Sequence, residues 1–295
     1  MRTQHTLVIV KRKEKVSYMR TTPQSIGELR SVYDMLSLKG KSALVTGAAG
    51  GIGRSTSAGF AELGANVCLM DVPQRESDLQ QCCKEITDRY GARTMYVLGD
   101  VSDPASVETF VKETSDAFGT IDVVHNNAGI GLAGDDSNLD IELWNKVIAV
   151  NQTGILLVGR ACANLMIEHG HGGSIVCTSS ISGLIVNKKP RGSHYGIVYP
   201  ATKAAVDHMT KAMAMDYIEH GIRFNSVCYG YIVSGLHKVE AGFPVEAFKD
   251  MCETTPMNRM GTLDETIGCV MYLASDLSSF ATGSTVVVDG GHCVW

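Results

Sequence analysis

The sequence predicts an α/β fold: a single doubly wound domain in which helices flank a parallel sheet. From Lys39 onward, short apolar runs alternate with longer amphipathic stretches. This alternation indicates right-handed strand–helix–strand units, because parallel neighbours need a connection long enough to hold a helix. A glycine-rich turn, TGAAGGIG at Thr46–Gly53, directly follows the first apolar run. A turn at that place is typical of a Rossmann-type nucleotide-binding domain.

The expected elements follow one another along the chain. Helices are expected to end at Gly64 and Gly221, because glycine readily takes the left-handed conformation that closes a helix. The expected strands, each a short apolar run, are 42–46, 65–71, 94–98, 121–125, 173–180, 222–227 and 284–291. The expected helices are 52–63, 75–90, 105–118, 141–169, 199–220 and 263–275. One domain over 38–295 holds them all, with a substrate lid expected at about 235–260.

Composition and charge exclude several classes of partner. Acidic residues outnumber Lys and Arg by 31 to 26, which disfavours nucleic acid or an anionic membrane surface as partner. No apolar run approaches the ~20 residues that a spanning helix needs. The chain has nine cysteines and no CxxC pair. We therefore expect reduced thiols, no metal site and a cytoplasmic location.

The first 37 residues differ from the rest of the chain. An apolar stretch, TLVIV, precedes the basic stretch KRKEK. A secretory signal has the opposite order and a longer apolar stretch. We expect residues 1–37 to form a poorly ordered or loosely docked extension.

Tyr199 and Lys203 stand four residues apart in YPATK, within an expected helix. Since one helical turn takes about 3.6 residues, the two side chains share a face. A lysine ammonium beside a phenol favours the ionised phenol, which brings it closer to use as an acid or base at neutral pH. Alone, the tyrosine indicates only an amphipathic residue on a helix, and the glycines indicate only a flexible turn. Together they indicate hydride transfer at an alcohol or ketone.

The glycine turn and Asp71 indicate a dinucleotide site. Gly47, Gly51 and Gly53 stand between a strand and a helix, where a phosphate needs close backbone approach and the positive end of a helix dipole. Asp71 ends the second strand, and a carboxylate there binds ribose hydroxyls and repels a 2′-phosphate. NAD is therefore expected rather than NADP. Of the nearby cations, Arg54 opens a helix and Arg75 is expected further along the loop.

Further motifs follow the glycine turn in a set order: Asp100-Val101, NNAG at Asn126–Gly129, Asn151 in VNQTG, Ser180 in TSS, YPATK, Gly230–Ser234 and VVVDGG. With the turn, they resemble the classical short-chain dehydrogenase/reductases over roughly residues 38–291. The resemblance implies that Tyr199 is the general acid/base and that Lys203 lowers its pKa and holds the nicotinamide ribose. It further implies that Ser180 polarises the substrate oxygen and that Asn151 holds a water in a proton relay. The implied cofactor residues are Gly47, Gly51, Ile52, Gly53, Asp71, Asp100 (near adenine), Val101, Asn127, Ala128, Gly129, Tyr199, Lys203, Gly230, Ile232 and Ser234.

The sequence departs from the family pattern in two places. The stretch between Ser180 and Tyr199 is longer than usual. Either Asn187–Tyr195 is an insertion at the substrate mouth, or the serine is Ser179 or Ser182. The basic residues of that insertion indicate either a cationic rim of the substrate entrance, suited to an anionic substrate, or a solvated surface loop. Tyr229 stands where the family has proline before Gly230.

The leading function is an NAD-dependent oxidoreductase that interconverts a secondary alcohol and a ketone, with a polyol or sugar as substrate. The alternatives are a hydroxysteroid or other apolar alcohol, and, in a different class, a catalytically inactive nucleotide-binding scaffold, which should lack the catalytic groups. An enoyl reductase would need a wider spacing between tyrosine and lysine. A homotetramer is expected. Helices 141–169 and 199–220 carry apolar residues on more faces than one sheet contact needs, for example Met209, Met213 and Met215, and the family resemblance implies that these helices form the subunit interface.

Overall fold

The structure, a computed structural model, describes residues 7–12, 15–20, 23–131, 140–188, 196–234 and 243–294, and their side chains from residue 23 onward. The chain divides into two compact units, Met1–Met35 and Leu36–Trp295. In the first unit, β1 (Leu7–Arg12) pairs antiparallel with β2 (Lys15–Arg20). A short helix, α1 (Val32–Leu36), follows at the boundary. The sequence did not predict this hairpin, and the loose docking of residues 1–37 stays a prediction.

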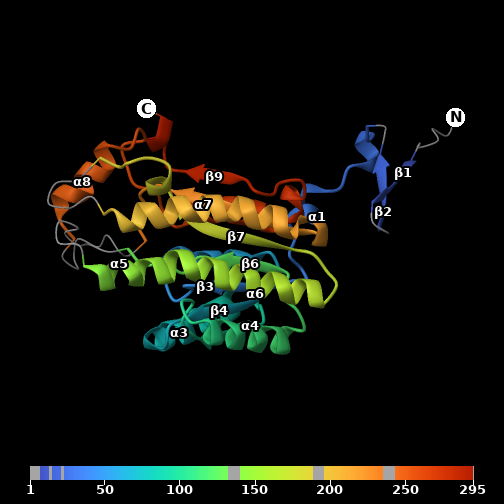
Figure 1. Ribbon diagram of the computed structural model, residues 1–295, viewed down its shortest axis with the longest axis horizontal. Helices are drawn as coiled ribbons and strands as arrows, with labels where there is room; N and C mark the ends of the chain where they lie inside the picture. Colours follow the sequence, from blue (N-terminus) through green and yellow to red (C-terminus); the bar gives the residue numbers. More distant parts are fainter. Residues whose placement is uncertain are drawn as a thin grey trace. The chain divides into compact units, whose positions relative to one another are not determined.

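The second unit is built on a seven-stranded sheet of order β5-β4-β3-β6-β7-β8-β9, in which every pair is parallel. This confirms the predicted fold class (Figure 1). The strand order reverses between β3 and β6, and parallel sheets bind ligands at the carboxyl ends of the strands on either side of such a switch. The strands are β3 (Ser42–Thr46), β4 (Asn66–Asp71), β5 (Thr94–Leu98), β6 (Val123–Asn126), β7 (Gly173–Ser180), β8 (Ile222–Tyr229) and β9 (Thr285–Val288).

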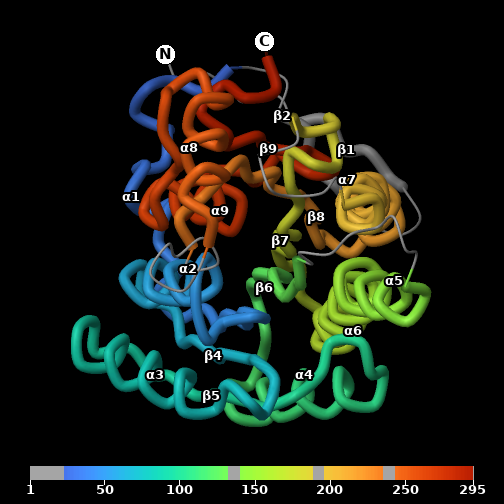
Figure 2. The backbone as a smooth tube through the Cα atoms, turned by 90° about the vertical axis from the view of Figure 1, so that its left-hand side faces the viewer, coloured from blue at the N-terminus to red at the C-terminus, as the bar shows by residue number. Residues whose placement is uncertain are grey.

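Helices cover both faces of this sheet (Figure 2). One face carries α2 (Gly51–Glu62), α3 (Glu76–Tyr90) and α9 (Asp264–Ala274); the other carries α4 (Pro104–Phe118), α5 (Ile141–Ile148), α6 (Gly154–Glu168) and α7 (Val198–Tyr217). Successive strand residues serve opposite cores, because side chains alternate along a strand. Val45 packs into the core under α2 and α3, and Leu44 into the core under α4 and α6.

Two parts of the helical pattern differ from the prediction. The helix expected over 141–169 is interrupted by a π-helical turn, Ala149–Thr153, which separates α5 from α6. Such a turn inserts an extra residue into the helix and is frequent at functional sites. An unpredicted helix, α8 (Val245–Glu253), lies within the segment expected to form the lid. Residues 235–242 of that segment lie outside the described residues.

The methionines of α7 do not share one face. Met213 is buried in the core with Phe224, and Met209 packs against the same core. Met215 alone of the three is exposed, at 71%. The expectation that all three add to a subunit interface is therefore wrong for Met213, whose burial is explained by the sheet contact.

Gly183 lets the turn after β7 approach α7 closely. This turn, Ile181–Gly183, packs on the first turns of α7. A Cβ atom added to Gly183 would lie 2.6 Å from the carbonyl carbon of Lys203 and 2.7 Å from the backbone nitrogen of Ala204. Backbone atoms cannot move aside as the end of a flexible side chain can, so a larger residue would push the end of β7 away from the helix.

Gly183→Ala is therefore expected to destabilise the fold by ~1–3 kcal/mol, the usual cost of overpacking. The matched control is Gly268→Ala on the exposed face of α9, where an added Cβ meets no atom within 4 Å. That change should stabilise the helix by up to ~1 kcal/mol, because alanine is the better helix former. Urea denaturation of both variants measures the difference, and equal stability of the two would contradict the close approach.

Candidate active site

Tyr199 and Ser180 meet where β7 ends beside the first turn of α7. Ser180 lowers the pKa of the Tyr199 phenol, which places this serine beside it, while the Ser180 hydroxyl donates to that of Ser182 at 3.3 Å. The two other candidate serines are engaged elsewhere. Ser179 donates to the backbone oxygen of Lys203 at 3.1 Å, and Ser182 lies behind Ser180 with its backbone N–H donating to the Ser180 hydroxyl at 3.2 Å. The longer stretch that precedes Tyr199 therefore leaves Ser180 against the phenol.

Lys203 lies one helical turn beyond Tyr199, with only 3% of its surface exposed. Its ammonium donates to the backbone oxygen of Thr178 at 2.9 Å and lies over the Tyr199 ring, 5.6 Å from the ring centre. Burial lowers the pKa of Lys203 to about 8, while the nearby carboxylate of Asp207 acts in the opposite direction. The ammonium is thus buried, fixed and close to the phenol.

The pKa of Tyr199 is shifted in the direction opposite to the one expected. Burial raises this pKa, and the hydrogen bond from Ser180 lowers it by less. The Lys203 ammonium bonds to the backbone oxygen of Thr178 and lies over the Tyr199 ring, and its expected lowering of the Tyr199 pKa stays a prediction. Ser180 is thus a group that favours tyrosinate in this structure.

Asn151 is fully buried within the π-helical turn. Its side-chain oxygen accepts from the backbone nitrogen of Ile130 at 2.8 Å, and its amide nitrogen donates to the backbone oxygen of Ile130 at 2.8 Å. These bonds hold the segment after β6 above Lys203. A Cβ on Gly129 would lie 3.3 Å from the Asn151 oxygen and 3.6 Å from the Lys203 ammonium. The structure brings Asn151 to the site, and its expected role in a water relay stays a prediction.

The glycine turn fits the phosphates of a dinucleotide. Gly47 and Gly51 have positive φ angles of 66° and 53°, which favour glycine. A Cβ on Gly53 would lie 2.2 Å from the backbone oxygen of Gly47, and one on Gly51 would lie 3.1 Å from that of Ser234. No side chain caps the start of α2, so its first N–H groups suit an anion. The segment Gly230–Ser234 passes beside this turn.

Asp71 and Arg75 both reach the glycine turn. Asp71 accepts hydrogen bonds from the backbone nitrogens of Ala49 at 3.0 Å and Val72 at 2.9 Å. Arg75 donates to the backbone oxygen of Ala49 at 3.2 Å, and its guanidinium lies 3.2 Å from where a Cβ on Gly50 would stand. The placement of Arg75 further along the loop was wrong, because the 3₁₀ turn Pro73–Arg75 bends the chain back.

The remaining predicted cofactor residues also lie near the carboxyl ends of the strands. Asp100 follows β5 and accepts from the backbone nitrogen of Ser102 at 2.8 Å. Val101 is buried, and Ile232 pairs with Gly261. His125, Thr178 and Asn127 form a further hydrogen-bonded group. Of the three, the sequence predicted Asn127 but not His125 or Thr178. The signal for this group was a lone histidine in the otherwise apolar run that precedes NNAG.

Tyr229 replaces the proline of the family pattern and anchors the end of β8. Its hydroxyl donates to the backbone oxygen of Thr266 on α9 at 3.1 Å. Gly230 then donates to the backbone oxygen of Val288 at 2.9 Å. The start of this loop is therefore fixed by hydrogen bonds. Of the expected insertion Asn187–Tyr195, residues 189–195 lie outside the described residues, Tyr195 included.

A family model and curated relatives match this chain over most of its length. A family model described as enoyl-(acyl carrier protein) reductase matches residues 47–292. L-rhamnose 1-dehydrogenase (NAD(P)(+)) of Sphingomonas sp. (strain SKA58) is 36% identical over 257 residues, which cover 87% of this chain and 98% of that protein. NADP-dependent mannitol dehydrogenase of Alternaria alternata is 34% identical over 276 residues, which cover 92% of this chain and 99% of that protein.

A solved structure adds to these sequence matches. The crystal structure of a short-chain type dehydrogenase/reductase from Mycobacterium marinum superposes with a TM-score of 0.81 at 34% identity. The superposition covers 90% of this chain and 100% of that one. With the motifs in place around Tyr199 and the glycine turn, the chain belongs to the classical short-chain dehydrogenase/reductase family.

Proposed function

We propose that this protein is an NAD(H)-dependent oxidoreductase that interconverts a secondary alcohol and its ketone, with a sugar or sugar alcohol as substrate. The observation that carries the proposal is the placement of Ser180 beside the Tyr199 phenol, whose pKa it lowers, with the buried ammonium of Lys203 over the Tyr199 ring one helical turn away. A catalytically inactive scaffold would have no use for this arrangement of titratable groups in a buried site.

The residues present fit a nicotinamide dinucleotide. The turn at Gly47–Gly53 and the start of α2 would hold its pyrophosphate, and Asp71 its adenosine ribose. The dinucleotide, when bound, supplies the hydride chemistry that no side chain can provide. The protein supplies the proton path. Ser180 donates to the substrate oxygen. Tyr199 takes the alcohol proton as tyrosinate during oxidation and returns it as the neutral phenol during reduction.

The substrate class rests on two kinds of support. The chain resembles proteins named for L-rhamnose and mannitol, which are both polyhydroxylated. A polyol also suits a site where the hydroxyls of Ser180 and Ser182 lie 3.3 Å apart, because both can donate or accept hydrogen bonds. A hydroxysteroid or other apolar alcohol remains the alternative, and the substrate panel below separates the two.

Tyr199→Phe is expected to lower the rate of alcohol oxidation by ~10²–10⁴, because it removes the general acid/base and nothing else. Folding and NADH binding should persist, since the ring remains. NADH absorbance across a panel of polyols, sugars, steroids and hydroxy acids measures the activity. The matched control is Tyr272→Phe, at a tyrosine on α9 that is partly exposed.

Near-normal turnover of the Tyr199→Phe variant would contradict the proposed role of Tyr199 as the general acid/base. If the protein oxidised steroids but no sugar or polyol, the proposed reaction would hold and the proposed substrate class would be wrong.

For the cofactor, we expect NAD⁺ to have the higher kcat/KM, because the Asp71 carboxylate would face the 2′-phosphate of NADP⁺. Asp71→Ala should narrow that preference. Arg75 places a cation near Asp71. Arg75→Ala should therefore lower kcat/KM for NADP⁺ below the wild-type value and leave kcat/KM for NAD⁺ nearly unchanged. Comparison of kcat/KM for both cofactors in the three proteins decides this. A wild-type preference for NADP⁺, as in the name of the mannitol relative, would overturn the assignment.

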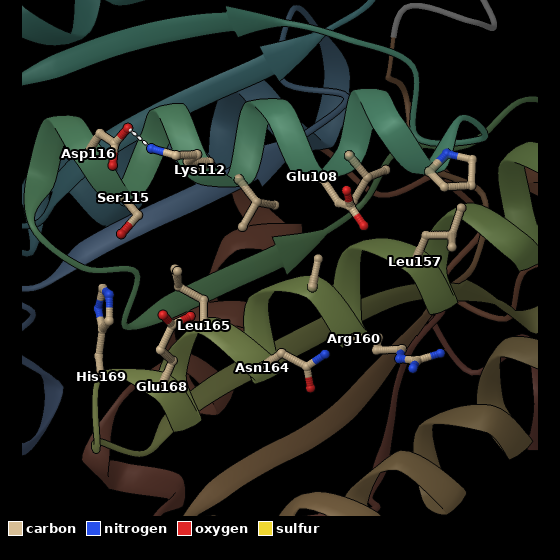
Figure 3. Close-up of a pocket in the computed structure, with 14 residues that line it drawn as sticks. Glu108, Lys112, Ser115, Asp116, Leu157, Arg160, Asn164, Leu165, Glu168 and His169 are labelled. Carbon is tan, nitrogen blue, oxygen red and sulfur yellow. Dashed lines mark hydrogen bonds and ion pairs between the residues drawn. The ribbon is translucent and has the colours of Figure 1, made fainter.

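We further propose a homotetramer, in which a second copy of the chain packs against α6. A groove of about 730 Å³ lies between α4 and α6, and no residue of the site lines it. Figure 3 shows side chains of both helices along its two sides. Charges of both signs occur at the groove, which suits a surface that pairs with its own copy. Its apolar lining includes Val107, Val111, Leu157, Ala161 and Leu165, and its charged residues include Glu108, Lys112, Arg160 and Glu168.

Sedimentation velocity at micromolar concentration is expected to show a tetramer. Ala161→Arg should shift it to smaller species, because a long cation would fill the groove. Lys84→Ala, on the exposed side of α3, is the control and should leave the tetramer intact. A monomeric wild-type protein would refute the proposal.

A cytoplasmic location is proposed from the cysteines, all nine of which are free. Thiol labelling of the protein in intact cells tests this, and disulfide-bonded cysteines would contradict it. Separately, none of the helices in the described part of the chain has the length and apolar character needed to cross a membrane.

A further inference from the structure

A buried histidine lies beneath the site and takes no part in the chemistry described above. His125, on β6, has no exposed surface, and its Nε2 lies 2.9 Å from the Thr178 hydroxyl on the neighbouring strand β7. The Thr178 hydroxyl lies 3.0 Å from the side-chain oxygen of Asn127. The Asn127 amide nitrogen in turn lies 3.0 Å from the backbone oxygen of Thr46 and 3.4 Å from that of Gly47. A single chain of hydrogen bonds therefore runs from His125 to the glycine turn.

The direction of every hydrogen bond in this chain is fixed. Backbone oxygens only accept, so the amide nitrogen of Asn127 must face them and its oxygen must face Thr178. That oxygen also only accepts, so it takes the one proton of the Thr178 hydroxyl. The Thr178 oxygen is then left to accept, and His125 must donate to it from Nε2.

The same reasoning fixes the state of His125. Its donating nitrogen is Nε2, and Nδ1 has no hydrogen-bond partner among the described residues. Burial lowers the pKa of His125 to about 3, so the ring is neutral across the working pH range. A neutral ring with a bare Nδ1 is costly on a strand whose residues Val123 and Val124 pack into the two apolar cores. Within the described part of the chain, the ring's hydrogen bond is the one to Thr178.

Thr178 joins the two halves of the site. Its side chain bonds to His125 and Asn127, and its backbone oxygen accepts the ammonium of Lys203 at 2.9 Å. On the other side, the backbone nitrogens of Asn127 and Ala128 donate to the Thr46 hydroxyl at 2.9 and 3.0 Å. A shift of Thr178 would therefore disturb both the glycine turn and Lys203.

We propose that His125 is a positioning residue: its donation to Thr178 fixes that side chain, and through it the Asn127 amide and the glycine turn that receives the cofactor. The inference rests on the proposed nicotinamide dinucleotide site. It assigns His125 no contact with cofactor or substrate, so its loss should weaken cofactor binding more than it slows the step that follows.

The test measures the Kd for NADH by fluorescence in wild type, His125→Leu and His125→Gln. His125→Leu removes the donor and should weaken binding by about tenfold, the order expected from one lost buried hydrogen bond. His125→Gln keeps a donor nitrogen near the position of Nε2 and should restore most of the affinity. The KM for cofactor should follow the Kd, with a smaller change in kcat.

Two further comparisons separate positioning from simple stability. Val124→Ala, on the same strand but facing the other core, should lower the Tm without changing the Kd for NADH. In the double variant His125→Leu/Thr178→Val, the losses should not add, because both changes break the same bond. If His125→Leu does not fold, His125→Asn takes its place: its side chain is too short to reach Thr178, and binding should weaken likewise.

A Kd for NADH that stays at the wild-type value in His125→Leu or His125→Asn would overturn the inference, as would additive losses with Thr178→Val. Those results would leave the proposed function intact. Failure of the wild-type protein to bind NADH at all would instead remove the proposed function, and the inference with it.

Discussion

The buried ammonium of Lys203 is the constraint on which the rest of the site depends. A charge with 3% exposure must be hydrogen-bonded, and here the acceptor is the backbone oxygen of Thr178 near the end of β7. That bond ties α7 to β7, and Gly183 lets the backbones come close enough to form it. Tyr199, one turn before Lys203, is thereby set beside Ser180. The geometry that performs the chemistry follows from satisfying one buried charge.

The sheet topology explains why this pair lies next to a nucleotide site. The order reverses between β3 and β6, so the glycine turn after β3 and the NNAG segment after β6 open on the same crevice. β7 is the next strand along, and it contributes both Thr178 and Ser180. Asn151 holds the segment after β6 over Lys203 through the π-helical turn. Parts distant in the sequence are thus joined by hydrogen bonds between side chains and the backbone.

Local patterns predicted most of the fold, and tertiary contacts decided what they missed. The strands 42–46, 94–98 and 173–180 were predicted with their observed bounds, because each is an apolar run between turn residues. The sequence did not predict the π-helical turn Ala149–Thr153, whose buried residue is the polar Asn151. The position of Arg75 was predicted wrongly because a 3₁₀ turn brings this residue back to the glycine turn. Met213 was wrongly predicted at a subunit interface because it packs into a core that strands distant in the sequence form. The sequence identified Ser180, Tyr199 and Lys203, whereas the direction of the Tyr199 pKa shift depends on burial, which spacing alone does not reveal.

In the proposed reaction the Tyr199 phenol exchanges the substrate proton, and burial and Ser180 shift its pKa in opposite directions. A titration of tyrosinate absorbance tests it directly in wild type, Ser180→Ala and Tyr199→Phe, with the difference from Tyr199→Phe isolating one of the ten tyrosines. Because the Ser180 hydroxyl lowers the Tyr199 pKa, Ser180→Ala should move that ionisation to higher pH. An ionisation that stays in place in Ser180→Ala, or a titration curve that Tyr199→Phe leaves unchanged, would contradict the account.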